Sequence, residues 1–255
     1  LDFGFLHNRI SGEIDIYNRK TDDLIYNVPV PGNTGYTTKT VNIGAMDNKG
    51  LEIVLNSDNV ITKSFKWSTS LNLSFNKNKI TRLDGNQTLI AGNDGRYLNS
   101  LIVGQSIGVF YGPKFAGADK ENGDALYYLP DGKSTTKDYD AAGNFIVGDP
   151  NPKIIGGFSN TFSFKGFDLS VLFQGVSGNK IINGAGGFMS SSFAWFDNQT
   201  KDQLNRWQKP GDMTNIEHYS RAGAAFGAYQ NYRLSDGSIT DASFIRLKTV
   251  VLSYN

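Results

Sequence analysis

The sequence contains no cysteine, and only two of its 255 residues are histidine. The absence of cysteine excludes disulfide bridges and thiolate metal sites. The 25 basic and 24 acidic side chains nearly cancel, and no run of basic residues indicates a nucleic-acid partner. No stretch approaches 18 consecutive apolar residues, so we expect no membrane-spanning helix. The 29 glycines, 17 phenylalanines and 12 tyrosines suit strands joined by turns and irregular loops.

Catalysis has little support in the sequence. His7 is expected in a turn and His218 in a loop, and there is no GxSxG elbow for a nucleophile. The glycine cluster NGAGGFM at 183–189 lacks the spacing of a phosphate-binding loop, so we expect a flexible loop. Three nearby carboxylates could bind a cation, but solvation at the surface is the simpler interpretation: Asp119, Glu121 and Asp124. We therefore predict no enzymatic activity, no cofactor and no metal site.

The clearest pattern is SFKWSTSLNLSFN at 64–76, in which every second residue faces the same way. A period of two over thirteen residues predicts an extended strand with one apolar and one polar face. Its apolar face carries Phe65, Trp67, Leu71, Leu73 and Phe75, with Thr69 among them. Either a soluble core or lipid could cover that face.

A second stretch, FSNTFSFKGFDLSVLFQG at 158–175, reads as a hairpin about Lys165-Gly166. Folding it there pairs Phe164 with Phe167, Phe162 with Leu169, Asn160 with Val171 and Phe158 with Phe173. All four pairs share one face, so a slip of one residue would turn the aromatic face over. If lipid covers this sheet, the lipid-facing residues of the hairpin are Phe162, Phe164, Phe167, Leu169, Val171 and Phe173.

The same patterns predict about seven strands, at 1–7, 9–27, 48–58, 63–80, 154–164, 167–177 and 242–255. The links alternate between short and long, as in an outer-membrane barrel with short periplasmic turns and long extracellular loops. Thirteen residues of about 3.3 Å each, tilted by about 45°, cover roughly 30 Å, the thickness of a bilayer core. A secreted soluble β-sandwich, such as a carbohydrate-binding module, is the alternative interpretation.

Two strands fit the membrane interpretation less well. In 242–255, Arg246 and Lys248 share a parity with Phe244, Val250 and Leu252, so neither face is purely apolar. Strand 9–27 turns polar at NRKTDD, which suits a strand that projects past the membrane. The chain lacks an initiator Met and a visible signal peptide and stops at VVLSYN, so we expect it to be part of a longer protein.

Several long segments resemble the SusC/RagA-type TonB-linked outer-membrane proteins of the Bacteroidetes. They are SGEIDIYNRKTDDLIYNVPVP (11–31), NIGAMDNKGLEIVLN (42–56), VGQSIGVFYGPKFAG (103–117), GDPNPKIIGGFSNTFSFKGFDLSVLFQGVSGNKI (148–181) and ASFIRLKTVVLSYN (242–255). They follow the order expected in the C-terminal part of the family's barrel. The resemblance covers essentially the whole chain.

The resemblance implies a transmembrane β-barrel of about 22 strands with a plug, located in the bacterial outer membrane. Residues 1–255 would form part of that single barrel domain, with the plug and the last strands outside this chain. Such proteins import oligosaccharides or peptides, receive energy from TonB through an N-terminal region, and pair with a SusD-like surface lipoprotein. We therefore expect outer-membrane lipid, that lipoprotein, TonB and a nutrient as partners.

Two segments depart from the family pattern. The family often has an acidic, calcium-loop-like run where this chain reads LPDGKSTTKDYDAAGN (129–144), with Lys133 and Ser134 at positions of further carboxylates. Many relatives have an IPR-like tripeptide where this chain reads NRWQKPGDMTNIEH (205–218). The first departure weakens the expectation of calcium at this place.

The two longest links are rich in aromatic residues, which offer large apolar contact areas for a sugar ring, a peptide or a protein lid. Internal packing of the loops is the competing explanation. The candidates for contact with substrate or with the lipoprotein are Tyr97, Phe110, Tyr111, Phe188, Phe193, Trp195, Phe196, Tyr229 and Tyr232. We expect TKDQLNRWQK to be helical and its Trp207 to be structural.

Overall fold

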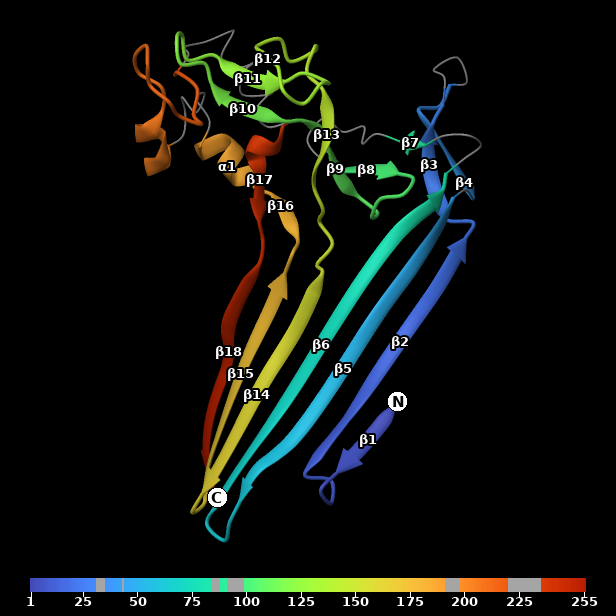
Figure 1. Cartoon of the computed structure of the whole chain (residues 1–255), viewed down its shortest axis with the longest axis vertical. Coiled ribbons are helices and arrows are strands. Elements are labelled where there is room, and N and C mark those ends of the chain that lie inside the picture. Colours follow the sequence, from blue (N-terminus) through green and yellow to red (C-terminus); the bar gives the residue numbers. More distant parts are fainter. Residues whose placement is uncertain (31–34, 43, 84–87, 91–98, 191–197, 220–234) are drawn as a thin grey trace.

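A computed structural model describes residues 1–30, 35–42, 44–83, 88–90, 99–190, 198–219 and 235–255 (Figure 1). Seven strands form one antiparallel sheet, here called the wall, in the order β1-β2-β5-β6-β14-β15-β18. Their bounds are β1 Asp2–Phe5, β2 Ile10–Asp22, β5 Ala45–Ile61, β6 Phe65–Arg82, β14 Ile154–Phe164, β15 Phe167–Ser177 and β18 Phe244–Tyr254. The wall is open at β1 and β18 and fills the lower part of Figure 1.

Short turns join the wall strands at one end. Residues 6–9 join β1 to β2, 62–64 join β5 to β6, and Lys165-Gly166 joins β14 to β15. Lys165 and Gly166 both have positive φ, 47° and 88°, as the tight turn between two right-twisted strands requires. The described parts of the long links 23–44, 83–153 and 178–243 all lie at the other end. The predicted alternation of short and long links is confirmed.

The long links fold into small elements that we call the loop domain. It holds a hairpin of β3 (Ile25–Pro29) and β4 (Thr38–Asn42) and a sheet of β7 (Leu89–Ile90), β8 (Asn99–Ile102), β9 (Val109–Pro113) and β13 (Asn144–Gly148). It also holds β10 (Phe115–Ala118), β11 (Ala125–Tyr128) and β12 (Thr135–Thr136), and the pair β16 (Lys180–Ile182) and β17 (Ile239–Asp241). Its helical pieces are α1 (Gly184–Met189), η2 (Lys201–Asn205) and η3 (Asp236–Ser238). In the described parts of the chain, no helix is both long enough and apolar enough to cross a membrane.

The loop domain contains most of the fully buried apolar side chains in the described chain. Val109, Phe110 and Tyr127 are 2%, 4% and 1% exposed, whereas few side chains of the wall are as buried. A second cluster, Ile80 and Leu83 with Leu101 and Val103, closes the upper end of β6. The compact core therefore lies above the wall, and the wall itself is a single layer.

The structure agrees with the predicted strands at most positions and corrects three details. The hairpin 154–177 has the predicted bounds and the predicted register at every pair from Phe158↔Phe173 to Phe164↔Phe167. The strand expected over 9–27 ends at Asp22, and β3 follows it. The segment 184–189 is a short helix and not a loop, and only 201–205 of TKDQLNRWQK is helical, as a 3₁₀ turn.

A bulge in β18 explains why the sequence of that strand alternates imperfectly between apolar and charged residues. Leu172 pairs with Thr249, but the next residue of β15, Phe173, pairs with Leu247, which leaves Lys248 as the extra residue. Above the bulge, Arg246 joins the polar row and donates to Gln174 Oε1 at 3.1 Å. An extra residue shifts the alternation by one. Ile245 and Leu247 above the bulge therefore share the apolar face with Val250 and Leu252 below it, whereas Phe244 and Val251 point to the other face.

Tyr17 and Gly50 pair directly across β2 and β5. The Tyr17 ring lies over Gly50 so closely that a Cβ at position 50 would overlap the ring. The Tyr17 ring therefore occupies the space that a side chain at position 50 would fill.

We predict that Gly50→Ala destabilises the wall by roughly 1–3 kcal/mol, because overpacking forces the ring or the backbone to move. Chemical unfolding of the full-length protein measures the effect. Gly184→Ala is the control, because a Cβ there meets no atom within 4 Å. Adding Tyr17→Ala to Gly50→Ala should restore most of the lost stability, because it removes the overlapping ring. A double variant no more stable than Gly50→Ala alone would contradict this explanation.

Candidate functional site

The register of the wall gathers one set of apolar side chains on one face, the apolar face. Directly paired residues of an antiparallel sheet point to the same side. The eleven residues predicted to share a face do so: Phe65, Trp67, Leu71, Leu73, Phe75, Phe162, Phe164, Phe167, Leu169, Val171 and Phe173. The pairing continues the same face through Leu51, Ile53 and Leu55 of β5, Ile14 and Ile16 of β2, and Ile245, Leu247, Val250 and Leu252 of β18.

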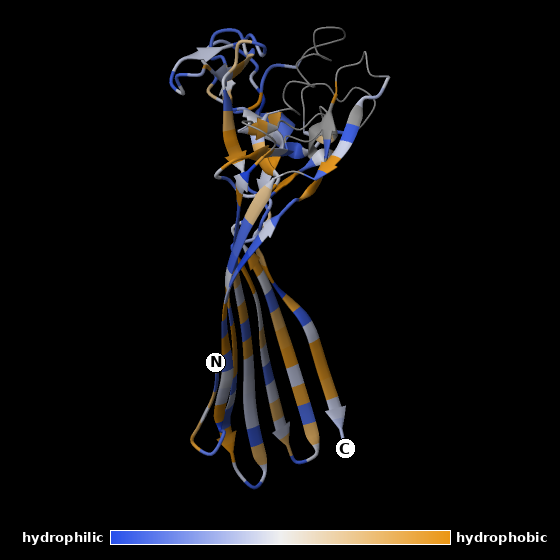
Figure 2. Ribbon diagram, turned by 90° about the vertical axis from the view of Figure 1, so that its right-hand side faces the viewer, coloured by the Kyte–Doolittle hydropathy of each residue, from blue (hydrophilic) through white to orange (hydrophobic). Residues whose placement is uncertain are grey.

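The apolar face is uncovered in the described chain. Wall strands contact mainly their neighbours, and no second sheet packs on them (Figure 1). Ile16 is 82% exposed and Leu252 is 68% exposed. Figure 2 shows the resulting alternation of hydrophobic and hydrophilic residues along the long strands. A sandwich would need a second layer on this face, so the single layer favours a wall that contacts something outside the chain.

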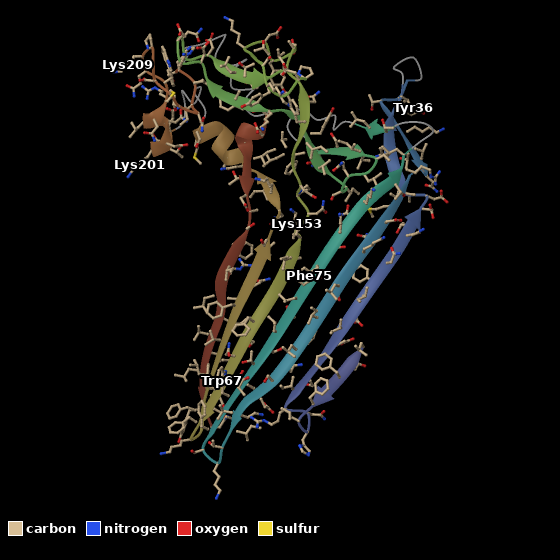
Figure 3. All side chains as sticks on the ribbon, in the orientation of Figure 1. Tyr36, Trp67, Phe75, Lys153, Lys201 and Lys209 are labelled. Carbon is tan, nitrogen blue, oxygen red and sulfur yellow. The ribbon has the colours of Figure 1, made fainter. Side chains whose placement is uncertain are left out.

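Aromatic rings concentrate at the short-turn end of the apolar face. Trp67 stacks on Phe162 with ring centroids 5.8 Å apart and planes 17° apart, and Phe167 lies 4.6 Å from Tyr254. Figure 3 places Trp67 near that end of β6 and Phe75 farther toward the loop domain. Aromatic girdles mark the interfaces of transmembrane barrels, where ring and polar tip suit the boundary between lipid and water.

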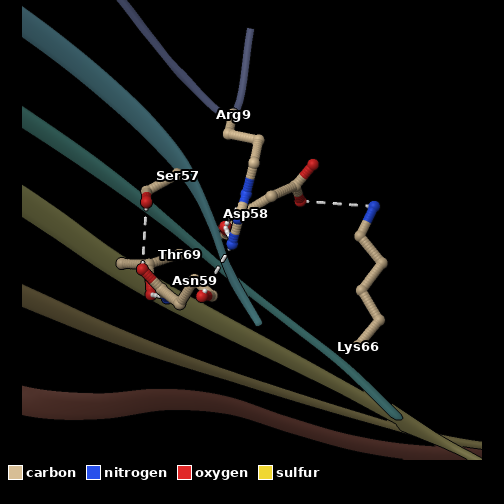
Figure 4. A network of polar contacts seen from close by, with 6 residues as sticks. All are labelled: Arg9, Ser57, Asp58, Asn59, Lys66 and Thr69. Carbon is tan, nitrogen blue, oxygen red and sulfur yellow. Dashed lines mark hydrogen bonds and ion pairs between the residues drawn. The ribbon is translucent and has the colours of Figure 1, made fainter. Parts of the chain in front are cut away.

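A chain of polar side chains crosses the apolar face just above this aromatic end (Figure 4). Ser57 donates to Asn59 Oδ1 at 2.9 Å, and Asn59 Nδ2 donates to Thr69 Oγ1 at 2.7 Å. Thr69 Oγ1 and Trp67 Nε1 both donate to Asn160 Oδ1 at 2.9 Å. Because these groups bond to one another, placing them on an apolar face costs far less than leaving them unpaired.

Arg9 anchors the same end from the first turn. Its guanidinium donates to the carbonyls of Asp58 and Asn59 at 3.0–3.2 Å, where β5 has a bulge. The Asp58 carboxylate pairs with Lys66 at 3.3 Å. These contacts lock the short-turn ends of β2, β5 and β6 together.

The opposite, polar face of the wall bears mainly small side chains. One row across four strands reads Ser11, Asn56, Ser70 and Ser159, and Asn72 lies one pleat above it. A polar hollow of about 290 Å³ lies here, lined by serines and threonines together with Arg9 and Asp58. A larger hollow of about 690 Å³ lies toward the loop domain, at the upper ends of β2, β5 and β6. Residues of both faces line it, among them Tyr17 and Asn76 of the polar face, Lys49 and Lys77 of the apolar face, and Asp149 of the loop domain. The polar face therefore offers hydrogen-bonding groups and free space.

Most of the candidate contact aromatics lie outside the described residues, and for Phe188 the side chain does. Those outside are Tyr97, Phe193, Trp195, Phe196, Tyr229 and Tyr232. Phe110 is only 4% exposed and lies against Gly148, which favours internal packing for that ring. Tyr111 pairs with Ile146 in the sheet of β9 and β13 and is partly exposed.

Sequence reasoning missed the core of Tyr127, Tyr139 and Phe115 in the loop domain. Tyr127 meets Tyr139 edge-on at 5.3 Å and Phe115 at 5.9 Å. Trp207 has the structural role that was expected: it covers Gly123, lies edge-on to His218 and donates to the Lys120 carbonyl at 3.2 Å, so it ties 120–124 to 207–218. These rings come from links without periodic patterning, so no sequence signal identified their partners.

The acidic residues of the loop domain bind backbone and basic groups. Asp119 accepts from Glu121 N at 2.8 Å, and Asp124 lies 3.6 Å from Lys137 and 3.8 Å from His218. In the segment 129–144, Asp131 accepts from the backbone N–H groups of Lys133 and Ser134, and hydrogen bonds from these two residues lower its pKa. Among the described residues, no three acidic or histidine side chains come together as metal ligands.

Asp236 links the loop domain to the end of the wall. Its carboxylate accepts from Phe115 N at 2.7 Å, and burial raises its pKa although Lys114 and Lys180 oppose the shift. Asp236 begins η3, and β17 follows and leads into β18. The packing of β10 thus positions the return of the chain into the wall.

Comparison with known proteins identifies the architecture. The family model described as "TonB dependent receptor-like, beta-barrel" matches residues 1–171. TonB-dependent receptor P26 of Formosa agariphila is 34% identical over 281 residues, covering 100% of this chain and 27% of that protein. TonB-dependent receptor SusC of Bacteroides thetaiotaomicron is 28% identical over 266 residues, covering 100% of this chain and 25% of that protein. The chain thus spans about a quarter of the length of these curated relatives.

Solved structures give the same result. The structure of the RagAB peptide transporter aligns with a TM-score of 0.85 at 28% identity, covering 99% of this chain and 28% of that chain. The RagAB peptide importer in its "open-open" state aligns with a TM-score of 0.84 at 28% identity, covering 98% of this chain and 27% of that chain. Wall and loop domain are therefore both similar to those of a solved importer.

The burial of Tyr139 in the loop domain makes the stability of the protein depend on pH in the alkaline range. Burial, with the nearby charge of Asp140, raises the pKa of Tyr139 from 10.0 to about 12. Folded Tyr139 keeps its proton where the unfolded residue has lost it, so stability falls as pH rises from about 10 to 12 and is unaffected below that range. We predict that Tyr139→Phe weakens this alkaline loss, measured by thermal midpoints of the full-length protein across that range. Tyr36→Phe, at a site 74% exposed, is the control, and equal alkaline losses in both variants would contradict the prediction.

Proposed function

The chain belongs to the TonB-dependent receptor β-barrel family, and from this premise we propose that it forms part of the wall of an outer-membrane nutrient importer. The observation that carries the proposal is the uncovered apolar face, continuous through all six strand pairings of the wall, opposite a polar face. A barrel in lipid needs this arrangement, because its outside contacts acyl chains and its inside contacts water and polar protein.

Strand length supports a membrane position. The eleven residues of β14 and of β15, at about 3.3 Å each and tilted by about 45°, cover roughly 26 Å along the normal. The outward apolar band of such barrels is about 25 Å tall. The wall strands β2, β5 and β6 continue beyond this height into polar residues, so their upper ends would stand in the aqueous phase. The lipid-facing set is then the eleven residues of the apolar face named above.

We propose that residues 1–255 are one part of a single barrel domain and that other parts of the full-length protein supply the remaining strands, a plug and the contact with TonB. The small side chains of the polar face leave room for such a plug. Transport here involves no enzymatic step: TonB-derived energy moves the plug, and cargo passes between plug and wall. A SusD-like lipoprotein would cover the loop domain at the extracellular mouth, as the similarity to SusC and RagAB suggests.

The cargo class is a nutrient too large for simple pores, either a peptide or an oligosaccharide. RagAB is described as a peptide transporter, and the alignment with it covers 99% of this chain, so this likeness favours peptides. The candidate loop aromatics other than Phe110, among them Tyr111, are the proposed contact residues, because flat rings offer large apolar contact areas to sugars and to apolar peptide side chains.

Uptake by cells that express the full-length gene tests the proposal. Deletion of the gene, or of TonB, should abolish uptake of labelled peptides or of labelled oligosaccharides, and complementation should restore it. Fractionation should find the protein in the outer membrane. A protein recovered in a soluble fraction, with uptake of both cargo classes unchanged by deletion, would exclude an importer.

The two faces of β6 give a sharper prediction. Leu71→Arg places a charge in lipid and should cost about 2–4 kcal/mol near the bilayer midplane, whereas Asn72→Arg, on the polar face, should cost much less. The two residues are neighbours on one strand, so backbone effects are matched. Folding of the full-length barrel into lipid vesicles, followed by denaturant titration, measures both, and equal tolerance would argue against lipid on the apolar face.

A further inference from the structure

Two lysines stand directly above the apolar band on the same face. Register pairs Lys49 of β5 with Lys77 of β6, one pleat beyond the paired residues Leu51 and Phe75. Both side chains are exposed. Like charges directly opposite each other destabilise a sheet unless an anion lies between them.

Within the described part of the chain, neither lysine has a carboxylate within ion-pair distance; the ion pairs there involve other residues. The next row reads Lys20, Asp47, Lys79, which adds two further positive charges and one negative charge. This corner of the apolar face therefore carries a net charge of about +3, without internal neutralisation of the Lys49–Lys77 pair.

An apolar groove begins on the same face just below the lysines. Register pairs Leu73 with Gly156 and Gly156 with Gly175, and the groove of about 240 Å³ runs over these two glycines. Leu71, Phe158, Phe173 and Ile245 line its sides. Glycine creates the hollow, because neighbouring positions of the face carry large side chains.

We propose that this corner binds one lipid of the membrane's outer leaflet through a phosphate on its headgroup. Lys49 and Lys77 hold the phosphate, and an acyl chain lies in the groove over Gly156 and Gly175. Lys77 and Leu73 are four residues apart, roughly 13 Å along the strand, which is within the roughly 15 Å depth of one leaflet's acyl layer. The inference rests on the membrane position proposed above.

Charge and shape together select this occupant. A free phosphate would use the lysines and leave the groove empty, and an uncharged lipid would use the groove and leave the like-charge pair uncompensated. A lipid with a phosphate headgroup satisfies both features at once. The extracellular side follows because Lys77 lies near the end of β6 that leads into the long link 83–153, and the long loops of outer-membrane barrels are extracellular.

The test compares Lys49→Gln/Lys77→Gln with the charge-matched control Lys120→Gln/Lys133→Gln in exposed positions of the loop domain. Full-length receptors are purified from outer membranes in mild detergent, delipidated, and titrated with outer-membrane lipid extract, with the same extract after phosphatase treatment, and with inorganic phosphate. Native mass spectrometry counts the lipid bound per barrel. Gly175→Val is the second variant; its Cβ would have ordinary contact with Ile245 Cγ1 at 3.4 Å, and its two methyl groups add volume to the groove.

We expect wild type and control to bind the phosphorylated lipid, and the lysine double variant to bind it roughly 30-fold more weakly. Gly175→Val should weaken it several-fold, and phosphatase treatment should reduce wild-type binding to the level of the double variant. Equal binding by the double variant, equal binding of dephosphorylated lipid, or displacement of the lipid by millimolar inorganic phosphate would overturn the inference. A protein that copurifies over the lysines in place of lipid would also overturn it.

Fractionation of the wild type separates the two proposals. A receptor that assembles in the outer membrane but shows no preference for phosphorylated lipid contradicts only the lipid site. A receptor absent from the outer membrane contradicts the proposed function and the lipid site together.

Discussion

Agreement of register between neighbouring strands is the constraint on which the wall depends. Each antiparallel pair fixes which residues share a face, so one apolar face exists only if all six pairings agree. A slip of one residue in a single strand would turn its apolar side chains to the polar face and expose charges in their place. The bulges in β5 and β18 serve this requirement, because each inserts one residue where the sequence alternation breaks and restores the common face.

The sequence predicted the wall well because its pattern is local. In 154–177, the turn residues and two uninterrupted alternating runs determine bounds and register without information from elsewhere in the chain. In β18 the same reasoning gave mixed faces, because a bulge is decided by the partner strand: Lys248 is extra only in relation to Leu172 and Phe173. Parity counted along one strand cannot reveal it.

The loop domain was beyond prediction for a different reason. Its strands are two to five residues long, and β9 pairs with β13 across more than 30 residues of chain. Such short segments carry no periodicity, and their stability comes from non-local burial of rings such as Tyr127 and Phe110. The same burial explains why an aromatic-rich loop is a poor guide to a binding site: part of that aromatic surface packs the loops themselves, and composition alone does not distinguish the two uses.

Most polar groups on the apolar face are hydrogen-bonded to one another, which leaves few of them available to bind other molecules. Asn160 and Thr69 are tolerated there because Trp67 and Asn59 donate to them, so the row presents few free hydrogen-bonding groups to its surroundings. Lys49 and Lys77 differ, because the described chain supplies no partner for them and their position is the edge of the apolar band. On the opposite face, serines and glycines leave volume unfilled. The polar groups at the centre of the apolar face are therefore paired with one another, whereas the upper edge of the wall keeps unpaired charges and the polar face keeps free space. Under the proposed function, these are the places where lipid headgroups, plug and cargo would meet the wall.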